Sequence, residues 1–138
     1  ASTYNTIVQN LANSASIGSG IGLTWKAVIS TGAAPNRAMD LAPVPNTARV
    51  FLVNGTMVAN GTTVPFYSFT VNHLAPINVT ELGTTLAAGS TTDRVWTGSN
   101  AGGSESSSGL MGSATPVFGH ANGTRAANGW PDSWSREN

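Results

Sequence analysis

The clearest structural pattern in this sequence is residues 48–59, Ala-Arg-Val-Phe-Leu-Val-Asn-Gly-Thr-Met-Val-Ala. Two apolar runs flank the pair Asn54-Gly55, and this arrangement is typical of a β-hairpin. An Asn-Gly pair favours a type I′ turn, because both central residues of that turn need a positive φ, which these two residues accept. We therefore predict two antiparallel strands, Ala48–Val53 and Thr56–Ala59, joined by a two-residue turn.

The N-terminal segment Thr3–Ala15 has the apolar spacing of an amphipathic helix. Its apolar residues recur at steps of three and four, which places them on one helical face: Tyr4, Ile7, Val8, Leu11 and Ala15. The glycine-rich stretch Ser16–Gly22 follows, and we predict that a glycine ends the helix, because glycine adopts the left-handed conformation at low cost. Residues Leu23–Ser30 then alternate and include β-branched side chains, so we predict a strand there.

The rest of the chain has weaker signals. We predict an extended edge segment at Val64–Val71, a loop at Ala75–Gly83 and a short strand at Asp93–Gly98. Residues Ser99–Asn138 are dominated by Gly, Ser, Asn and Ala. We interpret them as long loops that a few bulky side chains anchor to a core. The prediction is one α+β domain over residues 1–138, with an N-terminal helix, short antiparallel strands and long ordered loops.

Charged residues are rare, and this excludes several classes of function. Six Lys+Arg balance six Asp+Glu, and charged residues make up 9% of the 138 residues, against about 25% in an ordinary domain. A nucleic-acid-binding protein needs a basic surface, and six scattered cations do not form one. A surface with so few charges also lacks the repulsion that keeps copies of a protein apart. We therefore exclude nucleic acid as a partner and expect a homo-oligomer or filament.

The composition is typical of an exported protein. The chain has no cysteine, a single lysine, and many Gly, Ser, Thr and Asn residues. The small residues Ala1-Ser2-Thr3 are typical of a start left by signal-peptidase cleavage. No apolar run reaches the roughly 18 residues that a membrane span needs. We expect a secreted, extracellular protein at the cell surface, without a membrane span.

Residue types that perform catalysis are present, but not in arrangements that indicate an enzyme. The six carboxylates are scattered along the chain: Asp40, Glu81, Asp93, Glu105, Asp132 and Glu137. A glycosidase-like pair among them would depend entirely on the tertiary structure. The histidines, His73 and His120, have no metal-ligand spacing around them, and no Gly-x-Ser-x-Gly element is present. We predict a protein that is not an enzyme and has no cofactor and no metal ion.

Two groups of residues are candidate contact or modification sites. Four Asn-x-Ser/Thr sequons are candidate glycosylation sites: Asn54, Asn60, Asn78 and Asn122. About three are expected by chance in this composition, so their number carries no weight. In the polar tail, Trp130, Asp132 and Trp134 are candidates for contact with a glycan or a host protein. Exposed rings would stack on a partner, whereas rings folded back would anchor the tail to the core, and the sequence favours neither.

Four blocks occur in a recognisable order along the chain. They are T-W-K-A-x-x-S at Thr24–Ser30, V-x-G-T-x-V-A-x at Val53–Asn60, A-P-I-x-x-x-E-x-G at Ala75–Gly83 and V-W-T-G-x-x-x-G at Val95–Gly102. In these blocks the chain resembles an uncharacterised bacterial family of secreted proteins with an endostatin-like, C-type-lectin-like fold. The resemblance implies that fold, which hosts adhesins, receptor-binding proteins and some enzymes, so it does not decide the function.

The chain departs from that family at two places. Family members often have cysteines in the first helix and the tail, whereas this chain has none. They also tend to end in a strand that pairs in the middle of the fold, and Ser135–Asn138 does not resemble one. We predict that the fold closes differently or that a neighbouring subunit supplies a strand. The sugar-binding motifs of calcium-dependent lectins are also missing, and Trp130-Pro131-Asp132 is only distantly similar to them.

These observations favour a non-enzymatic extracellular protein that acts through surface contacts. We expect a structural or adhesive protein, with a self-assembling subunit of a cell-surface filament or appendage slightly preferred over a single adhesin. The alternative is a carbohydrate-binding, lectin-like domain that uses Trp130, Asp132 and Trp134.

Replacing Trp130 and Trp134 with alanine together separates these two hypotheses. If the protein is a lectin, the double variant loses glycan binding because the stacking platforms are gone, while self-assembly persists. Binding to a glycan array and light scattering measure the two properties. Glycan binding that survives in the double variant would contradict the lectin hypothesis.

Overall fold

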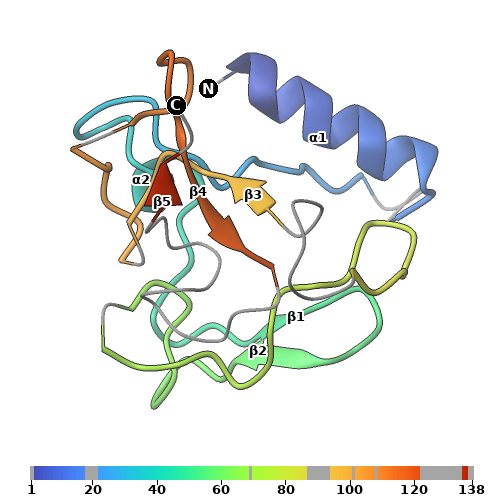
Figure 1. Cartoon of the computed structure of the whole chain (residues 1–138). Coiled ribbons are helices and arrows are strands. Elements are labelled where there is room, and N and C mark those ends of the chain that lie inside the picture. Colours follow the sequence, from blue (N-terminus) through green and yellow to red (C-terminus); the bar gives the residue numbers. More distant parts are fainter. Residues whose placement is uncertain are drawn as a thin grey trace.

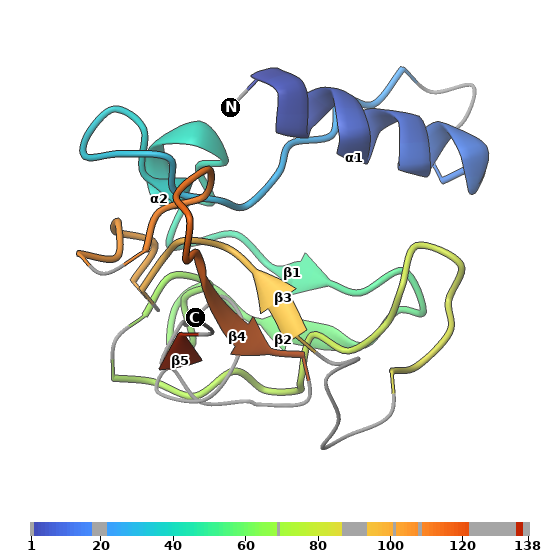
Figure 2. The same cartoon turned by 45° about the horizontal axis from the view of Figure 1, so that its top comes forward.

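The computed structural model describes residues 2–17, 22–68, 70–86, 94–100, 102–107, 109–121 and 135–136. Within these ranges the chain is an α+β protein with an N-terminal helix and two small antiparallel sheets (Figure 1), which confirms the predicted class. The helices are α1 (Ser2–Ser14) and α2 (Ala38–Leu41). The strands are β1 (Val50–Phe51), β2 (Met57–Ala59), β3 (Arg94–Trp96), β4 (Val117–His120) and β5 (Ser135–Arg136). Figure 2 shows that α1 lies to one side of both sheets.

Helix α1 confirms the predicted N-terminal helix, but a serine ends it. The N–H of Ile17 donates to the carbonyl of Ala12 (3.0 Å), and the N–H of Ser16 donates to that of Asn13 (3.1 Å). This pair of bonds closes a helix when the residue after the C-cap is left-handed. Ser16 takes that conformation, with φ of 58°. The prediction that a glycine makes the turn is therefore wrong. The two hydrogen bonds that close the last turn require the left-handed conformation at position 16, which is a serine.

Residues 23–29 run beside α1 without joining a sheet, so the predicted strand at Leu23–Ser30 is wrong. The side-chain oxygen of Gln9 accepts the N–H of Trp25, and that of Asn5 accepts the N–H of Ala27, both at 2.9 Å. Four helical residues advance about 6 Å and two extended residues about 6.6 Å, so the two spacings match. Side chains of the helix thus take the place that a neighbouring strand would have.

Strands β1 and β2 pair antiparallel and confirm the predicted hairpin, but its turn is of another type. The N–H of Gly55 donates to the carbonyl of Leu52 (2.9 Å), and Gly55 has φ of 86°. Asn54 does not have a positive φ, so the type I′ prediction is wrong. The arrangement is that of a three-residue loop whose last residue is a left-handed glycine. Asn54 acts through its side chain instead, which accepts the N–H of Thr56 at 3.0 Å.

The second sheet has the order β3-β4-β5, with all neighbours antiparallel. β3 confirms the predicted strand at Asp93–Gly98 within the described residues. β4 and β5 lie in the region predicted to be loops. Ser135 pairs with Phe118 of the central strand β4, so Ser135–Arg136 forms a strand at the edge of this sheet, and the prediction that no strand is present there is wrong. Strands of two to four residues are too short to show an alternating pattern, and long-range pairing creates them.

The predicted extended segment at Val64–Val71 consists of turns in its described part. The hydroxyl of Ser68 accepts the N–H groups of Thr70 (3.2 Å) and Val71 (2.9 Å). A serine that bonds to nearby backbone in this way competes with strand pairing. The predicted loop at Ala75–Gly83 is confirmed, with a single antiparallel bridge between Val79 and Thr85.

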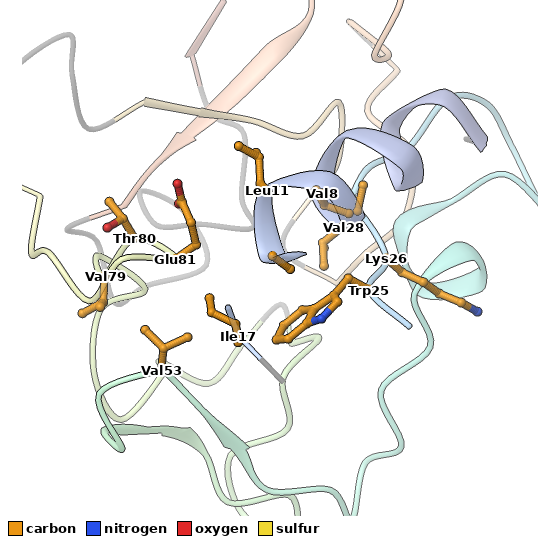
Figure 3. A pocket seen from close by; sticks show the side chains of 12 residues that line it. Val8, Leu11, Ile17, Trp25, Lys26, Val28, Val53, Val79, Thr80 and Glu81 are labelled. Carbon is orange, nitrogen blue, oxygen red and sulfur yellow. The ribbon is translucent and has the colours of Figure 1, made fainter. Parts of the chain in front are cut away.

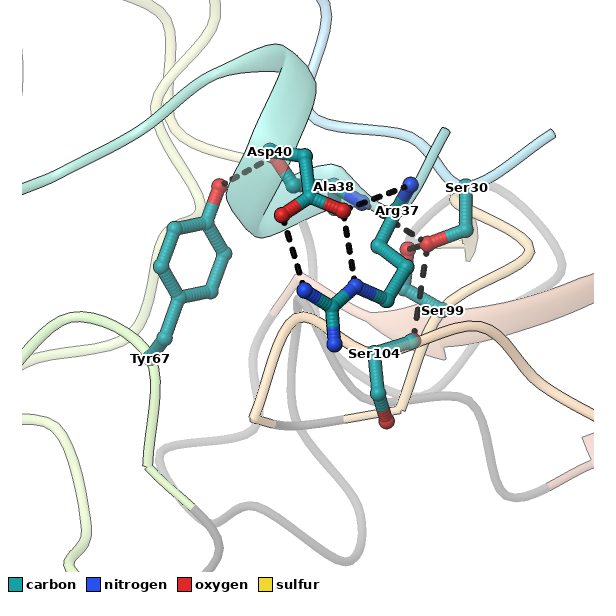
Figure 4. A network of polar contacts seen from close by, with 7 residues as sticks. All are labelled: Ser30, Arg37, Ala38, Asp40, Tyr67, Ser99 and Ser104. Carbon is teal, nitrogen blue, oxygen red and sulfur yellow. Dashed lines mark hydrogen bonds and ion pairs between the residues drawn. The ribbon is translucent and has the colours of Figure 1, made fainter. Parts of the chain in front are cut away.

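A buried polar network at Ser30 connects distant parts of the chain (Figure 4). Ser30 is fully buried; its hydroxyl accepts the N–H of Ala38 (2.9 Å) and shares a hydrogen bond with the hydroxyl of Ser99 (2.8 Å). Its backbone N–H donates to Thr97 (2.8 Å), and its carbonyl accepts the N–H of Met111 (3.0 Å). Burying a polar group is costly unless it is hydrogen-bonded, and the backbone N–H, the carbonyl and the hydroxyl of this serine are all hydrogen-bonded.

The polar side chains around α2 hold it in place. Arg37 forms an ion pair with Asp40 at 2.7 Å, and its hydrogen bonds hold the pKa of the Asp40 carboxyl below its ordinary value. The Tyr67 hydroxyl donates to the carbonyl of Ala42 (2.9 Å), also lies 3.2 Å from that of Ala38, and burial raises its pKa. These contacts fix the short helix against the region that follows β2.

Replacing Gly98 with alanine is expected to lower the free energy of unfolding by about 3 kcal/mol or more, through overpacking and left-handed strain. Gly98 has φ of 63°, and a Cβ there would overlap the backbone N of Met111 and lie 2.6 Å from the carbonyl oxygen of Ser30. The matched control is Gly55→Ala, because Gly55 has a positive φ but open space around it. The control is expected to lose only about 1–2 kcal/mol. Urea denaturation measures both, and equal losses would show that packing at Gly98 is unimportant.

Candidate functional site

An apolar groove with a volume of about 420 Å³ lies between α1 and the tip of the β1-β2 hairpin (Figure 3). Four parts of the chain line it: α1 with Ile17, the extended residues 25–28, Val53 at the hairpin tip, and residues 79–81. Val8 and Leu11 come from the apolar stripe that the sequence predicted, and Ala12 lies on the same helical face, because positions i, i+3 and i+4 share one face. In α1 only Ala12 is buried, so the predicted stripe itself is not fully covered.

Local hydrogen bonds hold the walls of the groove. Asn5 and Gln9 fix the extended wall to α1. On the opposite side, the N–H of Leu86 donates to the carbonyl of Asn78 (2.7 Å), and that of Thr80 donates to Thr84 (2.8 Å). These bonds close a small loop that presents Val79, Thr80 and Glu81. The groove is therefore formed by residues whose backbone conformation is fixed.

Exposed apolar side chains contribute to the groove and to the residues next to it in sequence. Nine large apolar side chains of the described residues are exposed; Leu11 and Val53 line the groove, and four others are close in sequence to lining residues: Ile7, Leu23, Phe51 and Leu82. Leu82 is 73% exposed, and Leu11 and Val53 are each about half exposed. Exposed apolar patches of this kind mark contact surfaces in soluble proteins. The apolar stripe of the helix was predicted from the sequence, whereas the groove beside it was not.

Two charged residues line the groove, and they lie on opposite walls. Glu81 stands beside Thr80, whereas the amine of Lys26 points away from the groove (Figure 3). No ion pair joins them; across the described part of the chain the one ion pair is Arg37–Asp40. Polar side chains do not converge inside the groove, so it is suited to apolar side chains rather than to a sugar or a phosphate.

None of the predicted glycosylation residues that the structure describes lines this groove. Trp130, Asp132, Trp134 and Asn122 lie outside the described residues, so the carbohydrate-binding alternative stays a prediction. Three sequons are described. Asn54 is exposed at the hairpin tip, and Asn78 is half-buried. The side-chain amide of Asn60 donates to the hydroxyl of Thr63 (2.8 Å) while its oxygen accepts the N–H of Val64 (2.8 Å), so its amide is already engaged.

The metal-ligating side chains do not gather in the parts of the chain that the structure describes. No three His, Asp or Glu residues there lie close enough to hold a metal ion. His73 packs against the ring of Phe66 at 5.7 Å between centroids, and its Nε2 lies 3.0 Å from the Phe66 carbonyl oxygen. Its Nδ1 is buried without a hydrogen-bond partner. Burial lowers the pKa of His73 below its ordinary value, although the bond to Phe66 opposes this shift.

No family model, curated protein or solved structure matches the chain. Among the described helices, none has the length and apolar character that a bilayer crossing requires. The function must therefore be argued from the geometry of the groove and its surroundings.

Lowering the pH through the histidine range is expected to destabilise the fold. The pKa of His73 is lower in the folded chain than in the unfolded one, so the unfolded chain binds the extra proton. This contribution to stability is complete above about pH 6.5 and decreases as the pH falls toward the folded pKa. Chemical denaturation between about pH 7 and pH 5 measures the loss.

The matched control for this prediction is His73→Gln. A glutamine amide can donate to the Phe66 carbonyl as Nε2 does, but it does not titrate. The variant is expected to lose less stability than the wild type over the same pH range. Equal pH dependence in the two proteins would show that His73 is not the responsible group.

Proposed function

We propose that this chain is a non-enzymatic, extracellular structural or adhesive protein, and that it acts as a self-assembling subunit of a cell-surface filament or appendage. The observation that carries the proposal is the apolar groove, whose lining includes the exposed side chains of Leu11 and Val53. Removing such surface from water gains about 25 cal/mol per Å², so a partner that covers it is favoured. Rare charges and zero net charge leave little repulsion between copies.

We also propose that the α+β structure is C-type-lectin-like and that the chain is related to the secreted bacterial family named above. The support is the order of the four sequence blocks between Thr24 and Gly102. An N-terminal helix beside short antiparallel strands agrees with this fold. Export to the cell surface is proposed from the composition, in which lysine is nearly missing and small polar residues are abundant.

The mass of the native particle tests self-assembly directly. A concentration series by light scattering is expected to give particles far heavier than the 14.1 kDa chain, and negative-stain microscopy is expected to show a regular repeat. Because the contact surface is apolar, sulfate salts should strengthen the assembly, whereas charge-driven association would weaken. A monodisperse 14.1 kDa monomer at every concentration and salt would overturn the proposal.

A further inference from the structure

The wall of the groove formed by residues 23–28 has one bonded edge and one open edge. In an extended chain, successive N–H groups point to opposite sides. The N–H groups of Trp25 and Ala27 face α1 and are bonded by its side chains. Those of Thr24, Lys26 and Val28 make no hydrogen bond to any described part of the chain. The open edge extends over four residue steps, or about 13 Å, which is the length of a short β-strand.

An open backbone edge specifies the chemistry of its partner. Unpaired N–H and C=O groups at strand spacing are satisfied by another extended polypeptide, which adds as a strand. The groove beside this edge is lined by Val8, Leu11, Val28, Val53 and Val79, and it can accept the apolar side chains that such a strand directs to one face. A sugar or a small polar ligand would leave these apolar side chains without complementary contacts.

We propose that the groove receives an extended segment of a second copy of this chain, which pairs with the open edge Thr24–Val28. This inference rests on the proposed self-assembly and names the surface through which it occurs. A second copy fits because its surface is equally poor in charge: charged residues make up 9% of the chain and its net charge is zero, so two copies bring little repulsion to the contact.

The pairing leaves a direct signature in hydrogen exchange. In the dilute protein, the amides of Thr24, Lys26 and Val28 are expected to exchange fast, because no described part of the chain accepts a hydrogen bond from them. In the assembled protein the same amides are expected to exchange more slowly by about a hundredfold or more. The amides of Trp25 and Ala27 serve as internal controls, because α1 protects them in both states. Residue-resolved hydrogen exchange before and after assembly measures the change.

A proline substitution tests the same edge by mutation. Lys26→Pro removes an N–H that the folded chain does not use, and it is expected to raise the concentration at which half of the protein is assembled by about tenfold. Lys26→Gln is the matched control, because it removes the charge and keeps the N–H. Thermal unfolding of both variants at low concentration checks that the single chain still folds.

The apolar side of the groove is tested by charge. Leu11→Asp and Val53→Asp place a carboxylate at the groove, and both are expected to raise the assembly midpoint by tenfold or more, about the cost of burying an unpaired polar group. Leu74→Asp is the control, because Leu74 is equally exposed (49%) but does not line the groove.

The outcomes separate this inference from the proposed function. Slowed exchange at Thr24, Lys26 and Val28, together with weaker assembly of the proline and groove variants, supports both. Particles that form while these three amides still exchange fast, and that the variants form equally well, would overturn the groove as the contact surface and leave self-assembly standing. A wild-type protein that stays monomeric would overturn both.

Discussion

The hydrogen bonds of Ser30 are the constraint on which the rest of the structure depends. This buried serine binds Thr97 and Met111 through its backbone, and Ala38 and Ser99 through its hydroxyl. Ser30 belongs to the segment between α1 and α2. Its bonds join this segment to α2, to the residues that follow β3 and to the residues that precede β4. Position 98 requires glycine, because a Cβ there would overlap the backbone atoms of Ser30 and Met111 that bond to each other. The residues that Ser30 contacts here, Ala38, Thr97 and Ser99, are fully buried and small, so hydrogen bonds rather than large apolar contacts join them.

The groove follows from how Ser30 and α1 share the segment between them. Ser30 fixes one end of the segment, and Asn5 and Gln9 hold alternate amides of the rest. The helix thus bonds the N–H groups of Trp25 and Ala27, and it leaves the N–H groups between and beside them facing away from it. With Val53 and Val79 on the far wall, the result is an apolar surface beside an open backbone edge. Self-assembly is the function that agrees best with both features.

Part of this fold could be predicted from local patterns. The spacing of Ile7, Val8 and Leu11 predicted α1, and Asn54-Gly55 predicted the hairpin, since both depend on residues close in sequence. The type of the turn and the residue that ends α1 could not be predicted. Each depends on which of several possible backbone hydrogen bonds is present in the folded chain. The groove was missed for a related reason: periodicity shows which residues share a face, but not whether another element covers that face.

Composition therefore determined the low charge, and local patterns determined the N-terminal helix and the hairpin. Only the tertiary structure decided that Trp25 and Ala27 bond to helix side chains, that β5 pairs with β4, and that Ile7 and Leu11 of the apolar stripe stay exposed. The physical reason is the range of the interactions. Turns and helical faces are set within a few residues, whereas the pairing of Ser30 with Thr97 or of Phe118 with Ser135 joins residues far apart in the sequence. No local pattern encodes such contacts.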